Sequence, residues 1–268
     1  MLQSPMWSQL ARLKFCFVHP GKRPISYLEK LGPMMIALQG ATPELEELNS
    51  SKHWICKGKR SMSIAATLLQ QNKVIAVPTD TVYGLAAAAM QTDAVRRLYE
   101  IKGRDENKPL CISVSKVTQV KHWGVVNHLH RNLLSTILPG PYTIILKRTP
   151  ALNPDLNPGI DTVGIRVPNS KFINCVSHII GPLALTSANV SNEPSCLRAT
   201  EFEKLWPRID GIFYDVKQVA SVKETLRKGS TIVDLSSPNH YKIVRTGIGI
   251  TYLISILRRF NLTEEKSD

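Results

Sequence analysis

From residue 61 onward, short apolar runs alternate with stretches in which apolar residues recur every three or four positions. The first pattern is typical of buried strands and the second of amphipathic helices, so their alternation predicts an α/β domain. Strands are predicted at residues 74–77, 110–114, 142–146, 163–167, 183–185, 212–216, 231–235 and 242–245. Helices are predicted at residues 61–69, 93–101, 132–138, 170–180, 200–206 and 250–260.

Three of the predicted helices begin with residues suited to capping. Ser61 and Ser170 each precede an amphipathic stretch, where a hydroxyl oxygen can accept a hydrogen bond from a free backbone N–H group. Thr200 and Glu203 have the spacing of a capping box. These residues fix where the predicted helices start.

The N-terminal extension and linker, residues 1–60, lack this alternation. The first 28 residues contain no acidic side chain but interleave apolar residues with Arg12, Lys14, Lys22 and Arg23. That composition is typical of a mitochondrial presequence. A disordered basic tail, or a start upstream of the true one, accounts for it equally well. Residues 61–262 are predicted to form one domain, and residues 263–268 a short C-terminal tail.

Composition sets broad limits on function. The chain of 268 residues is 43% hydrophobic, which is enough to bury a core. It contains no run of about 18 apolar residues, so no membrane-spanning helix and no integral membrane association are predicted. The net charge of +13 favours polyanionic partners such as nucleotides, RNA or acidic membrane surfaces.

Metal-ligand patterns are weak. The five cysteines are scattered without a CxxC pair, so neither a zinc site nor a disulfide framework is indicated, and a reducing, cytoplasmic compartment is favoured. His122, His128 and His130 have no cysteine or carboxylate nearby at ligand spacing. An exposed polar helix explains these histidines better than a metal site.

Residues 78–85, PTDTVYGL, directly follow the strand predicted at 74–77. Sites in open α/β sheets gather at strand ends. Thr79 and Thr81 offer hydroxyl groups, and Asp80 can accept a hydrogen bond from an ammonium group. A plain capped turn explains the same residues, so the motif alone does not establish a site.

A cluster of cations follows the helix predicted at 93–101. Lys102, Arg104 and Lys108 lie within seven residues, in KGRDENKPL. Because like charges repel, such a cluster is favourable where an anion binds, and a triphosphate fits. A solvated helix end, with cations near the negative pole of the helix dipole, is the alternative.

Ser187 and Asn189, in the segment TSAN, follow the strand predicted at 183–185, and Ser195 lies shortly beyond. Small hydroxyls and an amide at a strand end suit phosphate or ribose recognition. Ser187 lacks the GxSxG context of a hydrolase nucleophile. The chain has neither a GxxxxGK[ST] loop nor a GxGxxG fingerprint, so any nucleotide is held by another scaffold.

Two arginines stand at the ends of predicted strands. Arg166 lies in VGIRVP and Arg245 in IVRTG, and Ser230 lies in GSTIVD between TSAN and the second arginine. An arginine fork can clamp a carboxylate or a phosphate. A single arginine more often joins a surface ion pair, so their recurrence at strand ends is what predicts an anion site.

Taken in order, the segments PTDTVYGL, KGR followed by KPL, LPGPYTIIL, VGIRVP, PLALTSAN, GSTIVDL and a closing RTG resemble the YrdC-like family over residues 61–260. The resemblance implies a single YrdC-like catalytic domain, with a twisted mixed sheet flanked by helices around a positively charged cavity. It also implies condensation of L-threonine, bicarbonate or CO₂, and ATP to threonylcarbamoyl-AMP and pyrophosphate. Mg²⁺ normally accompanies the nucleotide.

The family's functional residues carry over by motif. The resemblance implies threonine contacts at Thr81, Arg166, Ser230 and the backbone of Leu185. It implies nucleotide contacts at Arg104, Lys108, Thr162, Ser187, Asn189, Ser195 and Arg245. Lys102 and Arg104 are the implied catalytic pair, which stabilises charge in a reaction that needs no protein nucleophile. Two departures weaken local assignments: Ser113 replaces a threonine-contacting histidine, and Asn192 and Glu193 replace a small, often glycine-containing segment.

The resemblance also implies a partner, a transferase complex that passes the threonylcarbamoyl group to the adenosine beside the anticodon of certain tRNAs. Two other functions stay open. A non-catalytic RNA-binding module could use a basic concave surface to hold duplex or transfer RNA through its phosphates. A carbamoyl-adenylate-forming domain of the same fold would use carbamoyl phosphate and need no threonine.

Overall fold

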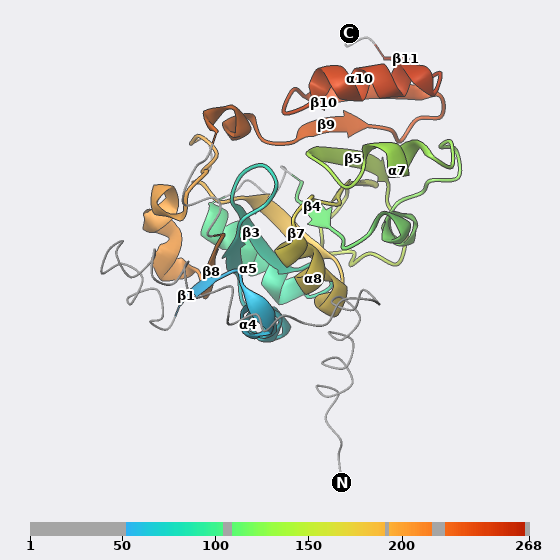
Figure 1. Ribbon diagram of the computed structural model, residues 1–268. Helices are drawn as coiled ribbons and strands as arrows, with labels where there is room; N and C mark the ends of the chain where they lie inside the picture. Colours follow the sequence, from blue (N-terminus) through green and yellow to red (C-terminus); the bar gives the residue numbers. More distant parts are fainter. Residues whose placement is uncertain (1–51, 104–108, 191–192, 216–222, 266–268) are drawn as a thin grey trace, which may run out of the picture.

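The structure is a computed structural model that describes residues 52–103, 109–190, 193–215 and 223–265 (Figure 1). Its strands are β1 (His53–Ile55), β2 (Ile75–Val77), β3 (Gly84–Ala88), β4 (Cys111–Ser113), β5 (Tyr142–Lys147), β6 (Thr162–Arg166), β7 (Leu183–Ser187), β8 (Gly211–Tyr214), β9 (Thr231–Asp234), β10 (His240–Arg245) and β11 (Thr263–Glu264). Its helices are α4 (Gly58–Gln70), α5 (Thr92–Lys102), α6 (Val120–Trp123), α7 (Leu133–Ile137), α8 (Lys171–Ile180) and α10 (Ile250–Arg259), with 3₁₀ helices η2 (Val117–Gln119), η3 (Ala199–Arg208) and η4 (Glu224–Lys228).

The described strands form one mixed sheet, in the order β1-β8-β2-β3-β7-β4-β6-β5-β9-β10-β11. β7 pairs antiparallel with both β3 and β4, whereas β6 runs parallel to β4, and β9 parallel to β5. The predicted α/β class, with a mixed sheet flanked by helices, is therefore confirmed. The positive charge expected of its cavity stays a prediction.

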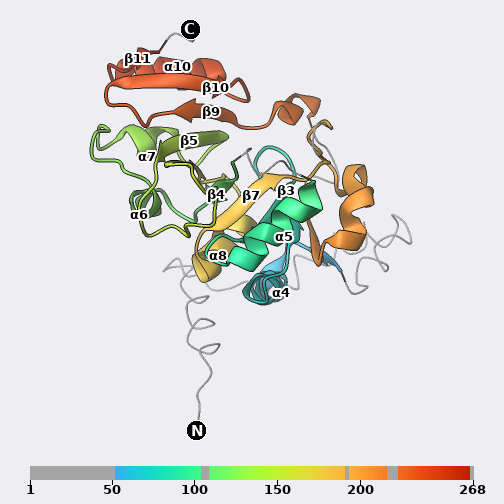
Figure 2. The ribbon, with the colours of Figure 1, turned by 180° about the vertical axis from the view of Figure 1, so that it is seen from behind.

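Helices cover the two faces of the sheet unequally. On one face α5, α7 and α10 pack a continuous core that reaches from Ala76 to Val233, and Figure 2 shows α5 lying across this face. On the other face, α4 and α8 pack a second cluster that extends along the described sheet no further than Cys111 of β4. The part of that second face formed by β6, β5 and β9 has no helix from either layer over it.

Burial along these three strands fits the uncovered stretch except at one end, where Thr143 and Arg166 are buried. Ile145, Gly164 and Ile232 are only partly buried, whereas the residues that alternate with them, such as Ile144 and Ile165, are buried. Successive side chains of a strand point to opposite faces, so the partly buried set belongs to the face without a helix. This stretch of sheet is named the open floor below, and it consists of Thr143, Ile145, Thr162, Gly164, Arg166 and Ile232.

Strand β3 is an element that the sequence pattern did not predict. Its sequence GLAAA is poor in the β-branched and aromatic residues that favour strands. All five residues are nevertheless buried, because β3 pairs with β2 on one side and β7 on the other. Central pairing has overridden local propensity, and it fixes the segment 78–83 as the connection between β2 and β3.

The predicted caps differ from those observed. The Ser61 hydroxyl donates to the carbonyl oxygens of Lys57 and Gly58 inside the first turn, since α4 begins at Gly58. Ser170 precedes α8 but makes no side-chain capping bond. The capping box predicted at Thr200 is wrong, because η3 is a kinked 3₁₀ helix that follows Arg198 and has no side-chain cap.

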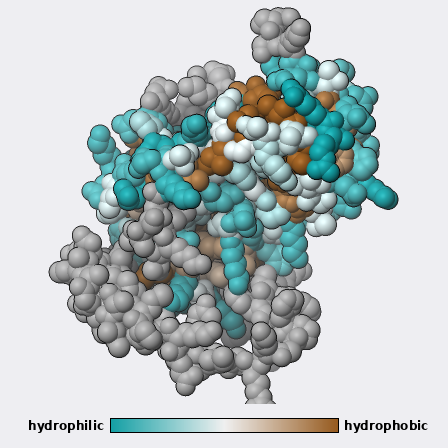
Figure 3. Space-filling model, turned by 45° about the horizontal axis from the view of Figure 1, so that its top comes forward, coloured by the Kyte–Doolittle hydropathy of each residue, from teal (hydrophilic) through white to brown (hydrophobic). Residues whose placement is uncertain are grey.

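Both ends of the described chain join the sheet. β1 pairs with β8 within the segment predicted as linker, and β11 pairs with β10 at the start of the predicted tail. Figure 3 shows hydrophobic surface in one part of the face it presents, and Val244 and Tyr252 are among the exposed large hydrophobic residues of the described chain. Among the described residues, no helix combines the length and hydrophobicity needed to cross a membrane.

Residues 245–249 fold back onto residues 229–231. The Gly247 N–H donates to Thr231 Oγ1 over 3.1 Å, and the Ile248 N–H donates to the Gly229 carbonyl oxygen over 2.9 Å. A Cβ atom on Gly247 would lie 2.5 Å from both the carbonyl carbon and oxygen of Ser230. Glycine is therefore required where these two backbone segments meet.

Gly247→Ala is expected to lower the free energy of unfolding by about 1–3 kcal/mol, the usual cost of overpacking. The added methyl group must push two backbone segments apart, because no flexible side chain lies in between. Urea denaturation measures the change, with the exposed neighbour Thr246→Ala as control. Equal stabilities of the two variants would show that the close backbone approach is absent.

Candidate active site

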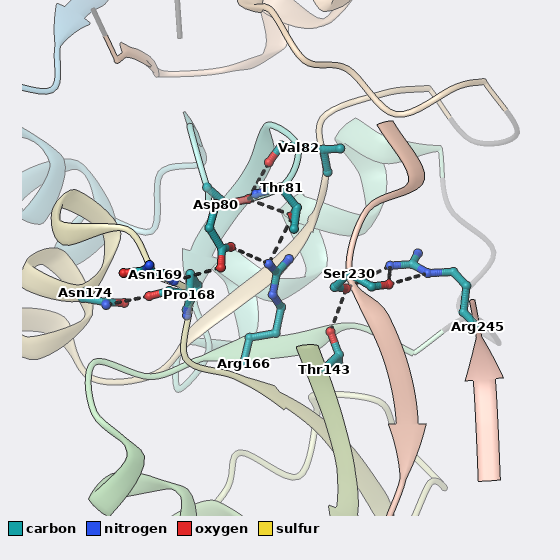
Figure 4. A network of polar contacts seen from close by, with 11 residues as sticks. Asp80, Thr81, Val82, Thr143, Arg166, Pro168, Asn169, Asn174, Ser230 and Arg245 are labelled. Carbon is teal, nitrogen blue, oxygen red and sulfur yellow. Dashed lines mark hydrogen bonds and ion pairs between the residues drawn. The ribbon is translucent and has the colours of Figure 1, made fainter. Parts of the chain in front are cut away.

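The segment between β2 and β3 is held against the end of β6 by a buried ion pair (Figure 4). Arg166 Nη2 donates to Asp80 Oδ1 over 2.9 Å and to Thr81 Oγ1 over 3.1 Å. The second carboxylate oxygen of Asp80 accepts from the Asn169 N–H over 2.9 Å. Asp80, expected to meet an ammonium group, thus meets a guanidinium group instead. Residues 80, 81 and 166 form the first of three polar groups.

The Thr79 side chain holds the turn at residues 79–82 through hydrogen bonds to backbone groups. Its hydroxyl donates to the Val82 carbonyl oxygen over 2.7 Å and accepts from the Thr81 N–H over 3.1 Å. The Tyr83 N–H donates to the Cys196 carbonyl oxygen, and the Tyr83 carbonyl oxygen accepts from the Ala188 N–H. The motif is therefore more than a capped turn, since it ties β6 to the loops that follow β7.

Two buried polar atoms beside this ion pair have no hydrogen-bond partner among the described residues: Ser113 Oγ and Arg166 Nε. β4 and β6 pair in parallel with Ser113 opposite Arg166, so the two atoms belong to neighbouring side chains on one face. Burying an unpaired polar group is costly. A ligand that carries both a donor and an acceptor would satisfy these two atoms.

The second polar group surrounds Ser230, just before β9 (Figure 4). Ser230 Oγ lies 2.9 Å from Thr143 Oγ1 of β5 and 3.0 Å from Arg245 Nη2 of β10. Arg245 also donates to the Ser230 carbonyl oxygen, from Nε over 3.2 Å and from Nη2 over 2.9 Å. The sequence assigned Ser230 to the threonine site and Arg245 to the nucleotide, and it predicted neither their mutual contact nor the contact of Thr143 with Ser230.

Strand register connects the first group to the second. β5 and β6 are antiparallel with Ile144 opposite Ile165, which puts Thr143 beside Arg166. Side chains directly opposite each other on an antiparallel pair lie on the same face. Thr81, Arg166, Thr143 and Ser230 therefore gather at one end of the open floor.

The third polar group joins α5 to the end of β7. Lys102 is 3% exposed, and its Nζ donates to the Ser187 carbonyl oxygen over 2.6 Å, to Ser187 Oγ over 3.2 Å and to Asn189 Oδ1 over 2.8 Å. Asn189 Nδ2 donates to the carbonyl oxygens of Val190 and Glu193. The solvated helix end that is the alternative to an anion site does not describe Lys102, because its ammonium group is buried in the TSAN turn.

The pairing of β3 with β7 also places the third polar group close to the first. Ser187 lies opposite Gly84, the residue that begins β3 directly after the segment 78–83. A Cβ atom on Gly84 would lie 2.7 Å from Leu185 Cδ1 and 3.3 Å from the Thr186 carbonyl oxygen, so glycine permits the close approach of β3 to β7. The turn that holds Lys102 is thereby fixed next to the segment that contains Thr81.

Ser195, predicted to contact nucleotide, is held in place by an arginine that sequence reasoning missed. Arg227 Nη1 donates to the Ser195 carbonyl oxygen over 2.8 Å, and the same guanidinium pairs with Glu201 and Glu224. Burial alone would raise the pKa of the Glu201 carboxyl group. The hydrogen bond from Arg227, the backbone hydrogen bonds from Leu197 and Arg198 and the charge of Arg227 together outweigh burial and lower this pKa. An ionised Glu201 thus fixes the loop that contains Ser195.

Of the remaining predicted residues, two lie within the described structure and three outside it. Thr162 is partly buried on the open floor, and the carbonyl oxygen of Leu185 accepts from Cys111 Sγ over 3.2 Å. Arg104, Lys108 and Asn192 lie outside the described residues.

Neither Cys56 nor Cys196 is prepared for thiol chemistry, and the described residues contain no metal-binding cluster. Burial, followed by the nearby Glu201 carboxylate, raises the pKa of Cys196 to about 11, and burial raises the pKa of Cys56 well above its ordinary value. Both sulfurs are protonated near neutral pH, and a thiol is a poor nucleophile. The described residues contain no group of three His, Cys, Asp or Glu side chains able to hold a metal ion. His128 contacts the Leu235 carbonyl oxygen, and the His130 ring contacts the Phe260 ring at a tilted angle.

Comparisons with known proteins identify the family. The family model Sua5_yciO_yrdC, described as "Telomere recombination", matches residues 67–247. The human protein named threonylcarbamoyl-AMP synthase is 39% identical over 225 residues, which are 83% of this chain and 76% of the human protein. The chain belongs to the Sua5/YciO/YrdC family.

Solved structures share the fold. The crystal structure of Pyrococcus abyssi Sua5 complexed with L-threonine superposes with a TM-score of 0.65 at 27% identity, covering 77% of this chain and 59% of that chain. The chain thus spans about three fifths of the Sua5 chain. E. coli YciO, at 22% identity and a TM-score of 0.64, covers 74% of this chain and 94% of that chain, and supports the fold alone.

Asp80→Asn, measured without substrates, is expected to lower the free energy of unfolding by about 3 kcal/mol or more, because it leaves the Arg166 charge buried without a counter-charge. The side chains of Arg166 and Asp80 are only 6% and 10% exposed. Chemical denaturation measures the effect. The matched control is Asp93→Asn, which breaks an exposed pair with Arg96 and should cost less than about 1 kcal/mol. Similar losses in the two variants would contradict the stabilising role of the buried pair.

Proposed function

We propose that this protein is a threonylcarbamoyl-AMP synthase, which condenses L-threonine, bicarbonate or CO₂, and ATP to L-threonylcarbamoyladenylate and pyrophosphate. The observation that carries the proposal is the meeting of Thr81, Arg166 and Ser230 at one end of the open floor. These residues come from segments far apart in a chain that is 39% identical to the human enzyme of that name. The complex of Pyrococcus abyssi Sua5 with L-threonine supports the amino-acid substrate.

The first and second polar groups are proposed to bind threonine. Arg166 keeps an unpaired, buried Nε atom, which suits a carboxylate because charge-assisted hydrogen bonds are the stronger ones. Thr81 and Ser230 supply hydroxyl groups on either side of Arg166, and the backbone of Leu185 supplies a further contact. The Ser113 hydroxyl, also unpaired, lies next to Arg166 on the neighbouring strand.

The third polar group is proposed to face the nucleotide. Ser187 and Asn189 are held by the buried Lys102 ammonium group, and Ser195 by Arg227. Arg104, Lys108, Thr162 and Arg245 complete the proposed nucleotide contacts. Lys102 and Arg104 are the proposed catalytic pair, which stabilises the negative charge that builds on the phosphate during transfer.

The proposed reaction has two steps. The threonine amine adds to the carbon of CO₂ and loses a proton, which gives a carbamate. A carbamate oxygen then attacks the α-phosphorus of ATP, and the bond from that phosphorus to the β-phosphate bridging oxygen breaks to release pyrophosphate. Both steps need alignment of substrates and cations rather than a protein nucleophile.

Mg²⁺ is proposed to arrive with ATP. The described residues offer no carboxylate cluster for a metal cage, and Asp80 already binds Arg166 and Asn169. Mg²⁺ commonly keeps water and substrate phosphates as ligands, so the nucleotide itself would supply its oxygens. The proposed chemistry assigns no step to the metal ion.

The proposal extends to the product's use. The threonylcarbamoyl group would pass through a transferase complex to the adenosine beside the anticodon of certain tRNAs. A cytoplasmic location with a mitochondrial pool is part of this proposal, and RNA contact would depend on the net charge of +13.

A fluorescent reporter fused to residues 1–50 tests the mitochondrial pool, and a purely cytosolic signal would exclude it.

The purified full chain is expected to release pyrophosphate from ATP only when both L-threonine and bicarbonate are present. Mass spectrometry with labelled threonine should detect the adenylate. An RNA-binding module would bind tRNA without pyrophosphate release, and a carbamoyl-adenylate-forming domain would replace both cosubstrates with carbamoyl phosphate. Either result would overturn the proposal.

Lys102→Met is expected to lower the rate of pyrophosphate release at least about 100-fold, the usual effect of removing one charge-stabilising group. Lys116→Met, at an exposed position, is the control and should leave the rate unchanged. Circular dichroism checks that the buried substitution preserves the fold. Arg104→Ala should act like Lys102→Met, and unchanged turnover in both variants would remove the assigned catalytic pair.

A further inference from the structure

Thr143 carries a buried hydroxyl group that none of the roles proposed above uses. The residue is 3% exposed on β5, and its Oγ1 atom lies 2.9 Å from Ser230 Oγ. Its Cγ2 methyl group lies 3.0 Å from the point where a Cβ on Gly164 would stand. The β5–β6 and β5–β9 registers place Thr143 beside Arg166 on one side and Ile232 on the other. Thr143 is thus fixed between β6 and β9 at the end of the open floor where Arg166 lies.

The direction of the hydrogen bond between Thr143 and Ser230 decides what Ser230 can do for a ligand. A hydroxyl group has one proton to donate and two positions at which to accept. Arg245 Nη2 donates to Ser230 Oγ over 3.0 Å and fills one accepting position. If Thr143 donates as well, both accepting positions are filled, and the single Ser230 proton is left for a third partner.

We propose that Thr143 is a positioning residue for the amino-acid substrate. Together with Arg245, it fills the accepting positions of Ser230 Oγ, so that the Ser230 O–H points as a donor at an acceptor oxygen of the bound amino acid. Arg166 beside Thr143 favours such an oxygen, since its guanidinium attracts negative charge to the same end of the floor. The inference rests on the proposed function, because it names the group that orients Ser230 in the threonine site.

Thr143→Val tests the role because valine keeps the shape and the methyl contact with Gly164 but has no hydroxyl group. Without its fixed donor, Ser230 can turn its proton away from the substrate. The KM for L-threonine is expected to rise about 10-fold, as for the loss of one hydrogen bond to a charged group. The KM for ATP should stay within about twofold, because Thr143 acts on the amino acid alone. Thr143→Ser retains the hydroxyl and should stay within about threefold of the parent chain in both constants.

A double-mutant cycle separates positioning from packing. If Thr143 acts only through the Ser230 hydroxyl, Thr143→Val has no further effect on the threonine KM in a Ser230→Ala background. Equal, additive effects in both backgrounds would show that Thr143 acts by packing and would overturn the proposal. A threonine KM that is unchanged in Thr143→Val would do the same. A general loss of structure would instead disturb the ATP KM together with the threonine KM, and this too would refute a specific role.

The failure of this inference differs from the failure of the proposed function. If the parent chain releases no pyrophosphate with threonine, bicarbonate and ATP, the enzyme assignment fails and takes the role of Thr143 with it. If the parent chain is active and Thr143→Val matches it in the threonine KM, only the role of Thr143 is lost. A threonine KM that rises in Thr143→Val and returns to near the parent value in Thr143→Ser, with the ATP KM unchanged, supports both the enzyme assignment and the role of Thr143.

Discussion

A guanidinium group buried at the end of β6 must be compensated, and this requirement organises the candidate site. Arg166 brings a charge into the protein interior, where an unpaired ion is strongly unfavourable. Asp80 supplies the counter-charge from a segment 86 residues away in the sequence, and with it come the hydroxyl of Thr81 and the shape of the whole β2–β3 connection. The ion pair therefore determines where the connection lies as well as how Arg166 is held.

The hydrogen bonding of Arg166 is incomplete, although its charge is compensated. Nη2 of Arg166 is used by Asp80 and Thr81, while Nε has no partner among the described residues. A fully satisfied arginine would be a structural element alone. An arginine anchored on one nitrogen and open on another can hold its orientation before a ligand arrives, which reduces the ordering that binding requires.

Arg166 lies on the sheet face that the described helices cover less completely. α4 and α8 pack over the β2, β3, β7 and β8 part of one face, whereas α5, α7 and α10 pack over the other face as far as β9. The core on the second side keeps β6, β5 and β9 in the sheet even though their first side has no helical layer. The helix-packed core and the candidate site therefore lie on opposite faces of the same strands.

The sequence predicted the parts of this arrangement that depend on local pattern, and missed those that depend on pairing. Apolar runs located β2, β5 and β9 within a residue or two, because buried strands leave a direct hydrophobic signal. β3 was not predicted because alanine and glycine do not favour strands. Its position is set by pairing with β2 on one side and β7 on the other. The motif order indicated Ser230 and Arg245 as site residues, but not that they contact each other, and Thr143 looked like one more residue of an apolar strand.

Thr143 also shows why polar roles on a sheet are hard to infer from a linear sequence. Its contact with Ser230 spans 87 residues and exists only because β5 pairs with β9, while its place next to Arg166 requires β5 to pair with β6 in one register. A slip of one residue would turn the hydroxyl to the opposite face. Hydroxyl groups acquire a donor direction only from their partners, so the chemistry of Ser230 is a property of three strands together. In a site whose proposed reaction depends on alignment, register is therefore as much a functional feature as the identity of any side chain.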